Sequence, residues 1–335
     1  MSGESVISVK NLKTYFYSEN RCNKAVNGVS FEIERGRTLC VVGESGCGKS
    51  VTASSIMQLL PKLSRIEEGE IVYHSETQGD IVLSKLKKNG KEMRSLRGKD
   101  IAMIFQDPMT ALNPVYKVGW QIMENIRQHE EVSKEEARKR TLDLLIQMGI
   151  PEPEKRIDQY PHEYSGGMRQ RAVIAMAMSC NPKVLLADEP TTALDVTIQA
   201  QIFELMEKLK KEHNTAILLI THDMGVVSEM ADDVIVMYMG NVIESGTARE
   251  VLKHPVHPYT RALLASIPIL GKGKEQQIEP IRGMTPNPHN RPKGCQFEPR
   301  CDFACDQCRE SMPEEEILEG NHMVRCHCWK EVAGE

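Results

Sequence analysis

A glycine-rich loop with a lysine and a serine carries the clearest chemical signal in this sequence. Residues 43–50 read Gly-Glu-Ser-Gly-Cys-Gly-Lys-Ser and match the P-loop pattern G-x-x-x-x-G-K-[ST]. The glycines allow consecutive backbone N–H groups to face phosphates, Lys49 can reach the β- and γ-phosphates, and Ser50 can ligate Mg²⁺. A structural glycine turn is the alternative, but the apolar run before the loop and the helical pattern after it favour phosphate binding. The other residues expected at the nucleotide are Gly43, Glu44, Ser45, Gly46, Cys47, Gly48 and Val51, with Cys47 acting as a spacer.

Two adjacent carboxylates follow a second apolar run. Residues 183–190 read Lys-Val-Leu-Leu-Ala-Asp-Glu-Pro, so a strand is expected to end at Asp188 and Glu189. In that position Asp188 can hold Mg²⁺ while Glu189 polarises an attacking water. Alone, the pattern is also typical of a solvated strand edge. The P-loop in the same chain is what favours the catalytic interpretation.

A third candidate site is a helix start that combines a serine with two glycines. Ser165, Gly166 and Gly167 precede an apolar helical pattern that includes Val173 and Ile174. The free N–H groups of a helix N-terminus favour an anion. A purely structural cap by the serine is the alternative interpretation.

The ten cysteines are unevenly distributed along the chain. Six of them lie between Cys295 and Cys328, and the other four precede this cluster. Clustered cysteines form disulfides in secreted proteins and metal sites in reducing compartments. The first ten residues lack the basic-then-apolar order of a secretory signal, so we favour a metal site. The scattered cysteines are Cys22, Cys40, Cys47 and Cys180.

Composition excludes several classes of protein. The chain has 335 residues, of which 40% are hydrophobic and 27% charged, as in a globular protein of about two domains. A formal net charge of -5 argues against a nucleic-acid partner. No apolar run approaches the roughly 18 residues that a spanning helix needs, so we expect that the chain itself does not cross a membrane.

Hydrophobic periodicity predicts an α/β fold. Apolar and polar residues alternate over residues 6–37, which indicates a small antiparallel sheet with one exposed face. Short runs that are apolar on both faces, separated by helical patterns, predict a buried parallel sheet. With the P-loop motif in the same chain, this pattern is typical of a P-loop NTPase (RecA-like) core with an antiparallel β subdomain. The expected buried strands are Leu39–Val42, Val184–Ala187, Ala216–Ile220 and Val234–Met237.

A helical subdomain is expected within this core. Residues from about 115 to 180 follow a helical pattern throughout. Ser133 and Glu136 have the spacing of a capping box at the start of a helix that reaches about Met148.

The domain organisation changes towards the C-terminus. Residues 1–253 are expected to form the main domain, and the proline-rich residues 254–294 a linker. Residues 295–335 are then expected to form a small cysteine-rich extension. Its acidic run, residues 314–316, is predicted to be a solvated helix start.

Taken together, the motifs resemble those of the ATP-binding-cassette (ABC) family. The P-loop is followed by the carboxylate pair as a Walker B motif, and Ser165-Gly166-Gly167 matches the family's signature sequence. The resemblance implies binding and hydrolysis of MgATP, with the P-loop of one subunit facing the signature loop of another. Met168 departs from the glutamine that the family most often has, so we assign the contact to Ser165 and the loop backbone.

The resemblance implies further site residues. Gln106 matches the Q-loop glutamine, with roles in catalysis and Mg²⁺ binding, and His222 matches the switch histidine. Asp195 in Ala193-Leu-Asp matches the D-loop. Phe16 matches the aromatic that stacks on adenine, although periodicity leaves its neighbours Tyr15 and Tyr17 as alternatives.

Two longer segments extend the resemblance to the ATPase subunits of oligopeptide and dipeptide permeases. These are residues 104–114, Ile-Phe-Gln-Asp-Pro-Met-Thr-Ala-Leu-Asn-Pro, and residues 254–261, His-Pro-Val-His-Pro-Tyr-Thr-Arg. Those proteins carry a C-terminal extension with cysteines at the same spacing, which gives the implied ligand set Cys295, Cys301, Cys308 and Cys326 and leaves Cys305 and Cys328 as additional. Four thiolates can hold a [4Fe-4S] cluster or Zn²⁺; the irregular spacing favours the cluster, and buried free thiols are the remaining alternative.

This resemblance implies an ATP-hydrolysing subunit that powers peptide import from the cytoplasmic side of the cell membrane. Its expected partners are a second ABC ATPase subunit, identical or related, two membrane permease subunits, and through them an extracytoplasmic peptide-binding protein. The transported species stays open between a dipeptide, a longer peptide, and a nickel or opine complex. Less favoured alternatives are a soluble ABC-type ATPase of iron-sulfur cluster assembly, a DNA-maintenance cassette and a small-molecule kinase.

Overall fold

A computed structural model of the chain describes residues 4–18, 21–107, 111–191, 194–266 and 281–334. These residues form two compact units. The first unit comprises the chain up to Val6, then Ile33–Arg37 and Lys85–Leu219. The second unit comprises Ile7–Glu32, Thr38–Ser84 and Ile220–Glu335. No helix among the described residues has the length and apolar character needed to cross a membrane.

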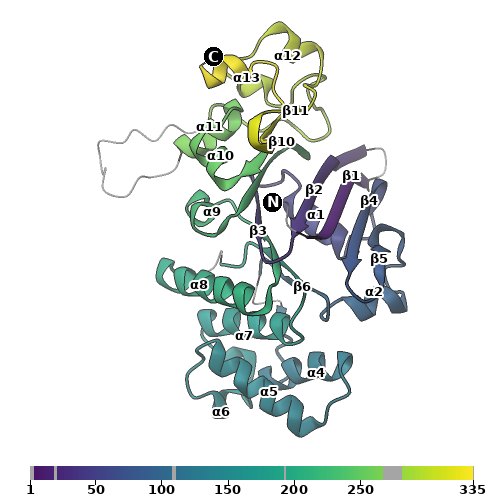
Figure 1. Cartoon of the computed structure of the whole chain (residues 1–335), viewed down its shortest axis with the longest axis vertical. Helices are drawn as coiled ribbons and strands as arrows, with labels where there is room; N and C mark the ends of the chain where they lie inside the picture. The colour runs from purple at the N-terminus through teal and green to yellow at the C-terminus, as the bar shows by residue number, and fades with distance from the viewer. Residues whose placement is uncertain (1–3, 19–20, 108–110, 192–193, 267–280, 335) are drawn as a thin grey trace. The chain divides into compact units, whose positions relative to one another are not determined.

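An antiparallel sheet opens the second unit, as the alternation over residues 6–37 predicts. Figure 1 shows its first two strands side by side in purple. The spatial order is β2-β1-β4-β5, with β1 Ser5–Ser18, β2 Arg21–Glu34, β4 Ser64–Ser75 and β5 Gly79–Val82. In β2 the buried Val29 and Ile33 are separated by exposed or half-buried residues, as expected for a strand with one exposed face, whereas residues 6–9 of β1 are buried without interruption.

A second group of strands in this unit leads to the P-loop. Every residue of β3, Thr38–Val42, is buried, and β3 pairs in parallel with β9, Asp233–Tyr238. The strand β10, Asn241–Thr247, returns antiparallel to β9. The helix α1, Lys49–Ile56, begins directly after the loop. The strand-loop-helix context expected for phosphate binding is therefore present.

The C-terminal segment extends this group of strands. The strand β12, Met323–Val324, pairs with β10, and β11, Glu316–Ile317, pairs with β12. The helix predicted to start at residues 314–316 is thus wrong, because Glu316 lies in a strand whose backbone bonds are satisfied by β12. The remaining helices of the unit are α9 Met224–Met230, α10 Ala248–Lys253, α11 Pro258–Ala265, α12 Asp306–Glu310 and α13 Trp329–Ala333.

The first unit holds the other predicted buried strands. Within it the order is β8-β7-β6, and β6 pairs in parallel with β7. The N–H of Ala216 donates to the carbonyl of Lys183, so β8 starts beside the start of β7. The strands are β6 Ile101–Ile104, β7 Val184–Asp188 and β8 Ala216–Ile220.

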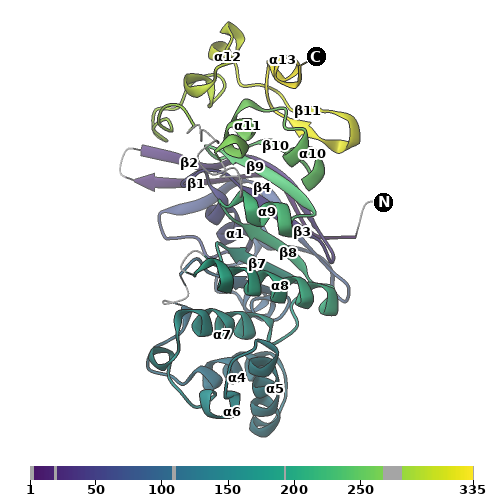
Figure 2. The same cartoon turned by 90° about the vertical axis from the view of Figure 1, so that its left-hand side faces the viewer.

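Helices fill the rest of the first unit, and the predicted helical region between residues 115 and 180 is confirmed. Figures 1 and 2 show α4, α5 and α7 gathered together in teal, and all three contact one another. Ser133 caps α5 as predicted, because its Oγ accepts the N–H of Glu136 at 3.1 Å. The helices are α2 Lys91–Leu96, α4 Val118–His129, α5 Lys134–Gln147, α6 Pro153–Arg156, α7 Gly166–Met178 and α8 Val196–His213.

Candidate nucleotide and cysteine sites

The P-loop needs glycine at three positions for reasons of backbone geometry. Gly43 has a φ of +149°, and a Cβ there would lie 2.2 Å from the carbonyl oxygen of Met237. Gly46 and Gly48 have φ values of +79° and +109°, which side chains rarely allow. A Cβ at Gly48 would also lie 2.3 Å from the carbonyl oxygen of Ala25. Nothing lies within 4 Å of a Cβ built at Gly46. The loop is therefore tightly packed at Gly48 and open at Gly46.

Lys49 lies inside the loop rather than on its surface. Its side chain is buried, and Nζ donates to the carbonyl oxygens of Gly43 at 2.7 Å and Glu44 at 3.1 Å. These bonds keep a positive charge at the position where the motif places phosphates. Burial raises the pKa of the Cys47 thiol, so this residue stays protonated and suits the predicted spacer role. Ser50 is exposed in the first turn of α1.

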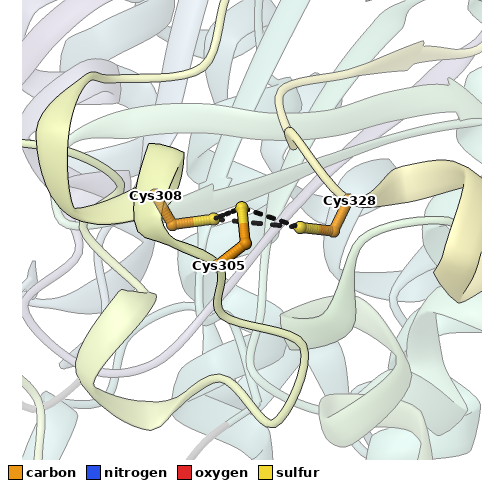
Figure 3. A group of neighbouring side chains, drawn as sticks. All are labelled: Cys305, Cys308 and Cys328. Carbon is orange, nitrogen blue, oxygen red and sulfur yellow. Dashed lines mark hydrogen bonds between the residues drawn. The ribbon is translucent and has the colours of Figure 1, made fainter.

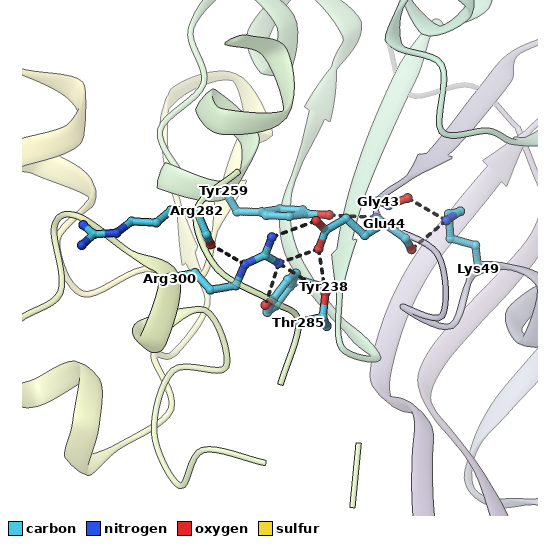
Figure 4. A network of polar contacts seen from close by, with 8 residues as sticks. All are labelled: Gly43, Glu44, Lys49, Tyr238, Tyr259, Arg282, Thr285 and Arg300. Atoms are coloured by element: carbon cyan, nitrogen blue, oxygen red, sulfur yellow. Dashed lines mark hydrogen bonds and ion pairs between the residues drawn. The ribbon is translucent and has the colours of Figure 1, made fainter. Parts of the chain in front are cut away.

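Residues far along the chain hold Glu44, the second residue of the loop. Its N–H donates to the Tyr259 hydroxyl at 2.8 Å. Its carboxylate accepts hydrogen bonds from both terminal nitrogens of Arg300, at 2.6 and 2.9 Å (Figure 4). The Thr285 hydroxyl donates to the same carboxylate at 3.1 Å. Sequence reasoning identified Glu44 as a loop member but missed these partners, since no local pattern marks them.

Tyr259 is positioned by the segment of residues 254–261, one of the two segments that carry the resemblance to peptide permease ATPases. His257 is the N-cap of α11, because its Nδ1 accepts the N–H of Tyr259 at 3.0 Å. Complete burial lowers the pKa of His257 to about 3, so the ring remains neutral and Nδ1 keeps its acceptor lone pair. Arg261 on the same helix donates to the carbonyl of Val332 near the C-terminus. The segment thus bonds to the P-loop at one residue and to the C-terminal segment at another.

In the first unit, two residues predicted to be catalytic lie in contact. The buried strand β7 ends at Asp188, and Gln106 Nε2 donates to Glu189 Oε2 at 2.9 Å. Glu189 has a φ of +46°, a conformation that costs a non-glycine residue about 1–3 kcal/mol. Strain of this size persists where the surrounding structure fixes the backbone, and it directs the Glu189 side chain to Gln106. No sequence signal announced this backbone geometry.

The Ser-Gly-Gly loop starts α7 as predicted. Ser165 Oγ accepts the N–H of Met168 at 3.3 Å, so the serine does cap the helix. Ser165 and Gly166 are exposed, and a Cβ at Gly166 would meet nothing within 4 Å. A Cβ at Gly167 would lie 3.1 Å from Ile198 Cγ2. The cap leaves the outer face of this loop open to a ligand.

The remaining predicted residues lie on the expected elements. Asp195 is the N-cap of α8 and accepts the N–H of Ile198 at 3.0 Å; its motif neighbour Ala193 lies outside the described residues. Residues 108–110 of the predicted permease segment also lie outside them. His222 follows β8 and is exposed. Phe16 lies in β1, opposite Ser64 of β4.

The aromatic neighbours of Phe16 make polar contacts. The Tyr15 hydroxyl donates to Asn27 at 2.8 Å, and the Tyr17 hydroxyl donates to Glu67. The Phe16 side chain has no polar atom that needs a hydrogen-bond partner. Of the three adjacent aromatic residues, we therefore favour Phe16 for stacking on adenine. Its contact with adenine stays a prediction, as do the nucleotide contacts of residues 43–51, Ser165–Gly167 and Asp195 and the Mg²⁺ assignments of Ser50, Gln106 and Asp188.

All ten cysteines are described residues and free thiols. Three of them form a close trio: Cys305 Sγ lies 3.5 Å from Cys308 Sγ and 3.4 Å from Cys328 Sγ, and the last two are 4.0 Å apart (Figure 3). Of the four predicted ligands, only Cys308 belongs to this trio.

The other three predicted ligands lie near Cys308 in a wider group. Burial raises the pKa of Cys295 and Cys301 to about 11 and that of Cys326 to about 12. Each of the four predicted thiols is close enough to the other three for the charge of one to raise the pKa of another. The N–H of Cys295 also donates to the carbonyl of Cys308 at 2.8 Å. The structure therefore brings the predicted set into one neighbourhood, with sulfurs spaced more widely than in the trio.

Two families match the sequence. The family described as ABC transporter matches residues 26–192, and the family described as Oligopeptide/dipeptide transporter, C-terminal region, matches residues 243–308.

Named relatives match along nearly the whole chain. The dipeptide transport ATP-binding protein DppD of Bacillus subtilis is 48% identical over 324 residues, covering 96% of this chain and 94% of that protein. The oligopeptide transport ATP-binding protein AppD of the same species is 47% identical over 331 residues and 99% of each chain. DppD of Haemophilus influenzae is 46% identical over 323 residues, covering 96% of this chain and 95% of that protein.

Solved structures share the fold. The ATP-binding cassette MJ0796, in a dimeric post-hydrolysis state with ADP and Pi, gives a TM-score of 0.64 at 27% identity, covering 72% of this chain and 99% of that one. CbiO1 of Clostridium perfringens, part of the ABC transporter complex cbiONQ, gives 0.61 at 27% identity, covering 75% and 91%. The predicted fold class is thereby confirmed.

Proposed function

Because the chain belongs to the ATP-binding proteins of ABC transporters and is an ABC-type ATPase, we propose that it hydrolyses MgATP to power uptake of dipeptides or oligopeptides. The observation that carries the proposal is the bond from Gln106 to Glu189. It joins a glutamine that can sense the nucleotide to the carboxylate that can orient water, on a backbone fixed in an unusual conformation. The carboxylate acts on the water, and Lys49 neutralises phosphate charge.

The proposed substrate class rests on the C-terminal half of the chain. Residues 243–308 match the oligopeptide/dipeptide transporter region, and the named relatives above are dipeptide and oligopeptide transport proteins. An ABC ATPase of this kind works with a second cassette and with membrane permease subunits. We propose that the chain binds them peripherally at the cytoplasmic face, with two permease subunits receiving peptides from an extracytoplasmic binding protein.

Glu189→Gln tests this function in the assembled transporter. Hydrolysis should fall by about 10²–10⁴-fold, the usual contribution of a positioned general base, while ATP binding persists. Glu212→Gln is the matched control, because this partly exposed glutamate lies on α8 in an i,i+4 pair with Lys208 and should leave the rate unchanged. Uptake of labelled dipeptide, oligopeptide and nickel complexes in cells with only the Glu189→Gln protein should be lost for peptides. Near-normal hydrolysis by Glu189→Gln, or loss of nickel uptake alone, would contradict the proposal.

We further propose that Cys295, Cys301, Cys308 and Cys326 hold a [4Fe-4S] cluster. Beyond cysteine, only five buried apolar residues support residues 281–334, namely Phe297, Pro313, Met323, Val324 and Val332. A metal bound by thiolates supplies folding free energy that so small a core lacks. The donor set fits, since four soft sulfurs meet in one neighbourhood. Zinc is the second candidate, favoured by the short spacing of the trio Cys305, Cys308 and Cys328.

Single serine substitutions distinguish the two metals. Anaerobically purified protein should be brown and contain about four irons per chain. Serine at Cys295, Cys301 or Cys326 should remove the iron, whereas serine at Cys305 or Cys328 should leave it. Stoichiometric zinc that is lost on substitution of Cys305 or Cys328, in colourless protein, would place zinc at the trio instead. Metal-free protein with an ordered C-terminal segment would contradict both metals and favour buried free thiols.

A further inference from the structure

Arg300 is a buried cation in the cysteine-rich extension, called here the cysteine-bearing segment (residues 295–334), and its side chain reaches the P-loop. The residue is 6% exposed and directly precedes Cys301. Its terminal nitrogens donate to both carboxylate oxygens of Glu44, as Figure 4 shows. Its Nε donates to the carbonyl of Arg282 at 2.9 Å. All three nitrogens of the guanidinium therefore donate to a partner from the second unit.

The surroundings of this ion pair are mostly aromatic. The Arg300 guanidinium lies over the rings of Tyr238 and Phe297, 5.9 and 5.8 Å from their centroids, and also donates to the Tyr238 hydroxyl. Tyr259 packs against both rings. A charge among such groups is stable only when it is paired, because few water molecules can solvate it. Glu44 supplies the negative charge that pairs with Arg300, and this ion pair fixes the position of the Glu44 side chain.

The charge of Glu44 also matters for the loop itself. A carboxylate in the P-loop repels the phosphates of ATP unless a cation offsets it. Burial raises the pKa of Glu44, but the bonds and charge of Arg300 outweigh burial and lower it, and Lys49 acts in the same direction. The carboxylate is therefore ionised, and Arg300 is the cation that it contacts directly.

We propose that Arg300 is a positioning residue for ATP, through which the cysteine-bearing segment fixes the P-loop and offsets the charge of Glu44. This inference rests on the proposed nucleotide role of residues 43–50. Arg300 acts on ATP affinity through Glu44 and not by contacting a phosphate itself. The Tyr259 hydroxyl adds a neutral contact to the backbone of the same loop residue.

Equilibrium binding of a fluorescent ATP analogue to the full chain, displaced by MgATP, tests the proposal. Arg300→Ala should raise the Kd for MgATP about tenfold, within the usual range of coupling between two sites. Arg300→Lys keeps the charge and should restore part of the affinity. Arg300→Ala combined with Glu44→Gln should bind better than Arg300→Ala alone, since the uncompensated carboxylate is then gone. Arg282→Ala, whose side chain makes an exposed pair with Asp302, is the matched control and should bind like the unaltered chain.

The outcomes separate this inference from the proposed function. If the unaltered chain does not bind ATP, the nucleotide role of the loop is wrong, whereas unchanged ATP affinity in folded Arg300→Ala overturns the inference alone. A double variant that shows the sum of two independent losses also overturns it, because that result removes the coupling. Tyr259→Phe, which deletes one hydroxyl and should remain folded, should accelerate hydrogen exchange at the Glu44 amide; unchanged exchange there counts against the backbone contact that Tyr259 of α11 adds to the positioning of Glu44.

Discussion

Two glycine-containing helix starts in this molecule are built in opposite ways. The P-loop before α1 is held inside its unit by Lys49, by the Tyr259 hydroxyl and by Arg300. The Ser165–Gly167 loop before α7 is exposed at Ser165 and Gly166 and is held by local bonds, from the Met168 N–H to Ser165 Oγ and from the Arg169 N–H to the Ser165 carbonyl. Both present helix N–H groups, so both suit an anion. The first has its cationic side chain in place within the chain, whereas the second offers only backbone and a hydroxyl.

This difference indicates how the two loops would share one nucleotide. A loop fixed by its own chain can bind ATP before any partner arrives, because its geometry costs nothing more to organise. An exposed loop with an open outer face gains a role only when another molecule brings phosphates to it. We therefore expect P-loop substitutions to change ATP binding in the isolated chain, and Ser165 substitutions to change turnover in the assembled transporter.

Lys49→Ala should give the largest effect and tests the first half of the comparison. Loss of the buried Lys49 ammonium, which donates to two carbonyl oxygens of the loop, should weaken MgATP binding and reduce turnover by about 10²–10³-fold. The affinity loss should appear in the isolated chain, measured by fluorescent ATP analogue binding. If the isolated Lys49→Ala chain binds ATP normally and turnover fails only with its partners, the P-loop does not bind ATP independently of the assembled transporter.

Sequence reasoning predicted what local patterns encode. The buried strand Leu39–Val42, the cap at Ser133 and the loop 43–50 each rest on neighbouring residues, and the structure contains all three. Glu44 and Arg300 are 256 positions apart in the sequence, and no local sequence pattern at either residue predicts their contact. Its discovery needs the folded backbone.

The cysteine segment shows the same limit. Spacing and resemblance pointed to four ligands around Cys308, but the trio with Cys305 and Cys328 depends on how α12 meets the residues before α13. The positive φ of Glu189 could not be predicted from the sequence either, because glutamate has no preference for that conformation.

Phe16→Ala should have a moderate effect and shows how far the fixed nucleotide region extends. Stacking of a base on an aromatic ring contributes about 1–3 kcal/mol, so the ATP concentration for half-maximal turnover should rise about tenfold with little change in maximal rate. Tyr15→Phe and Tyr17→Phe serve as controls, because each removes only a hydroxyl that bonds to Asn27 or Glu67. An effect of Tyr15→Ala or Tyr17→Ala in place of Phe16→Ala would assign the stacking to the neighbour.

Ser165→Ala should give the smallest change and tests the second half of the comparison. Loss of a serine N-cap costs about 1 kcal/mol, which corresponds to a Tm decrease of about 2–4 °C. Ser133→Ala is a matched control, since Ser133 caps α5 in the same unit with the same type of bond, at 3.1 Å against 3.3 Å. Both variants should lose similar stability, measured by thermal unfolding, but only Ser165→Ala should also slow ATP turnover in the assembled transporter. Equal turnover in the two variants would mean that Ser165 serves α7 alone, and the anion site at this loop would then depend entirely on its backbone N–H groups.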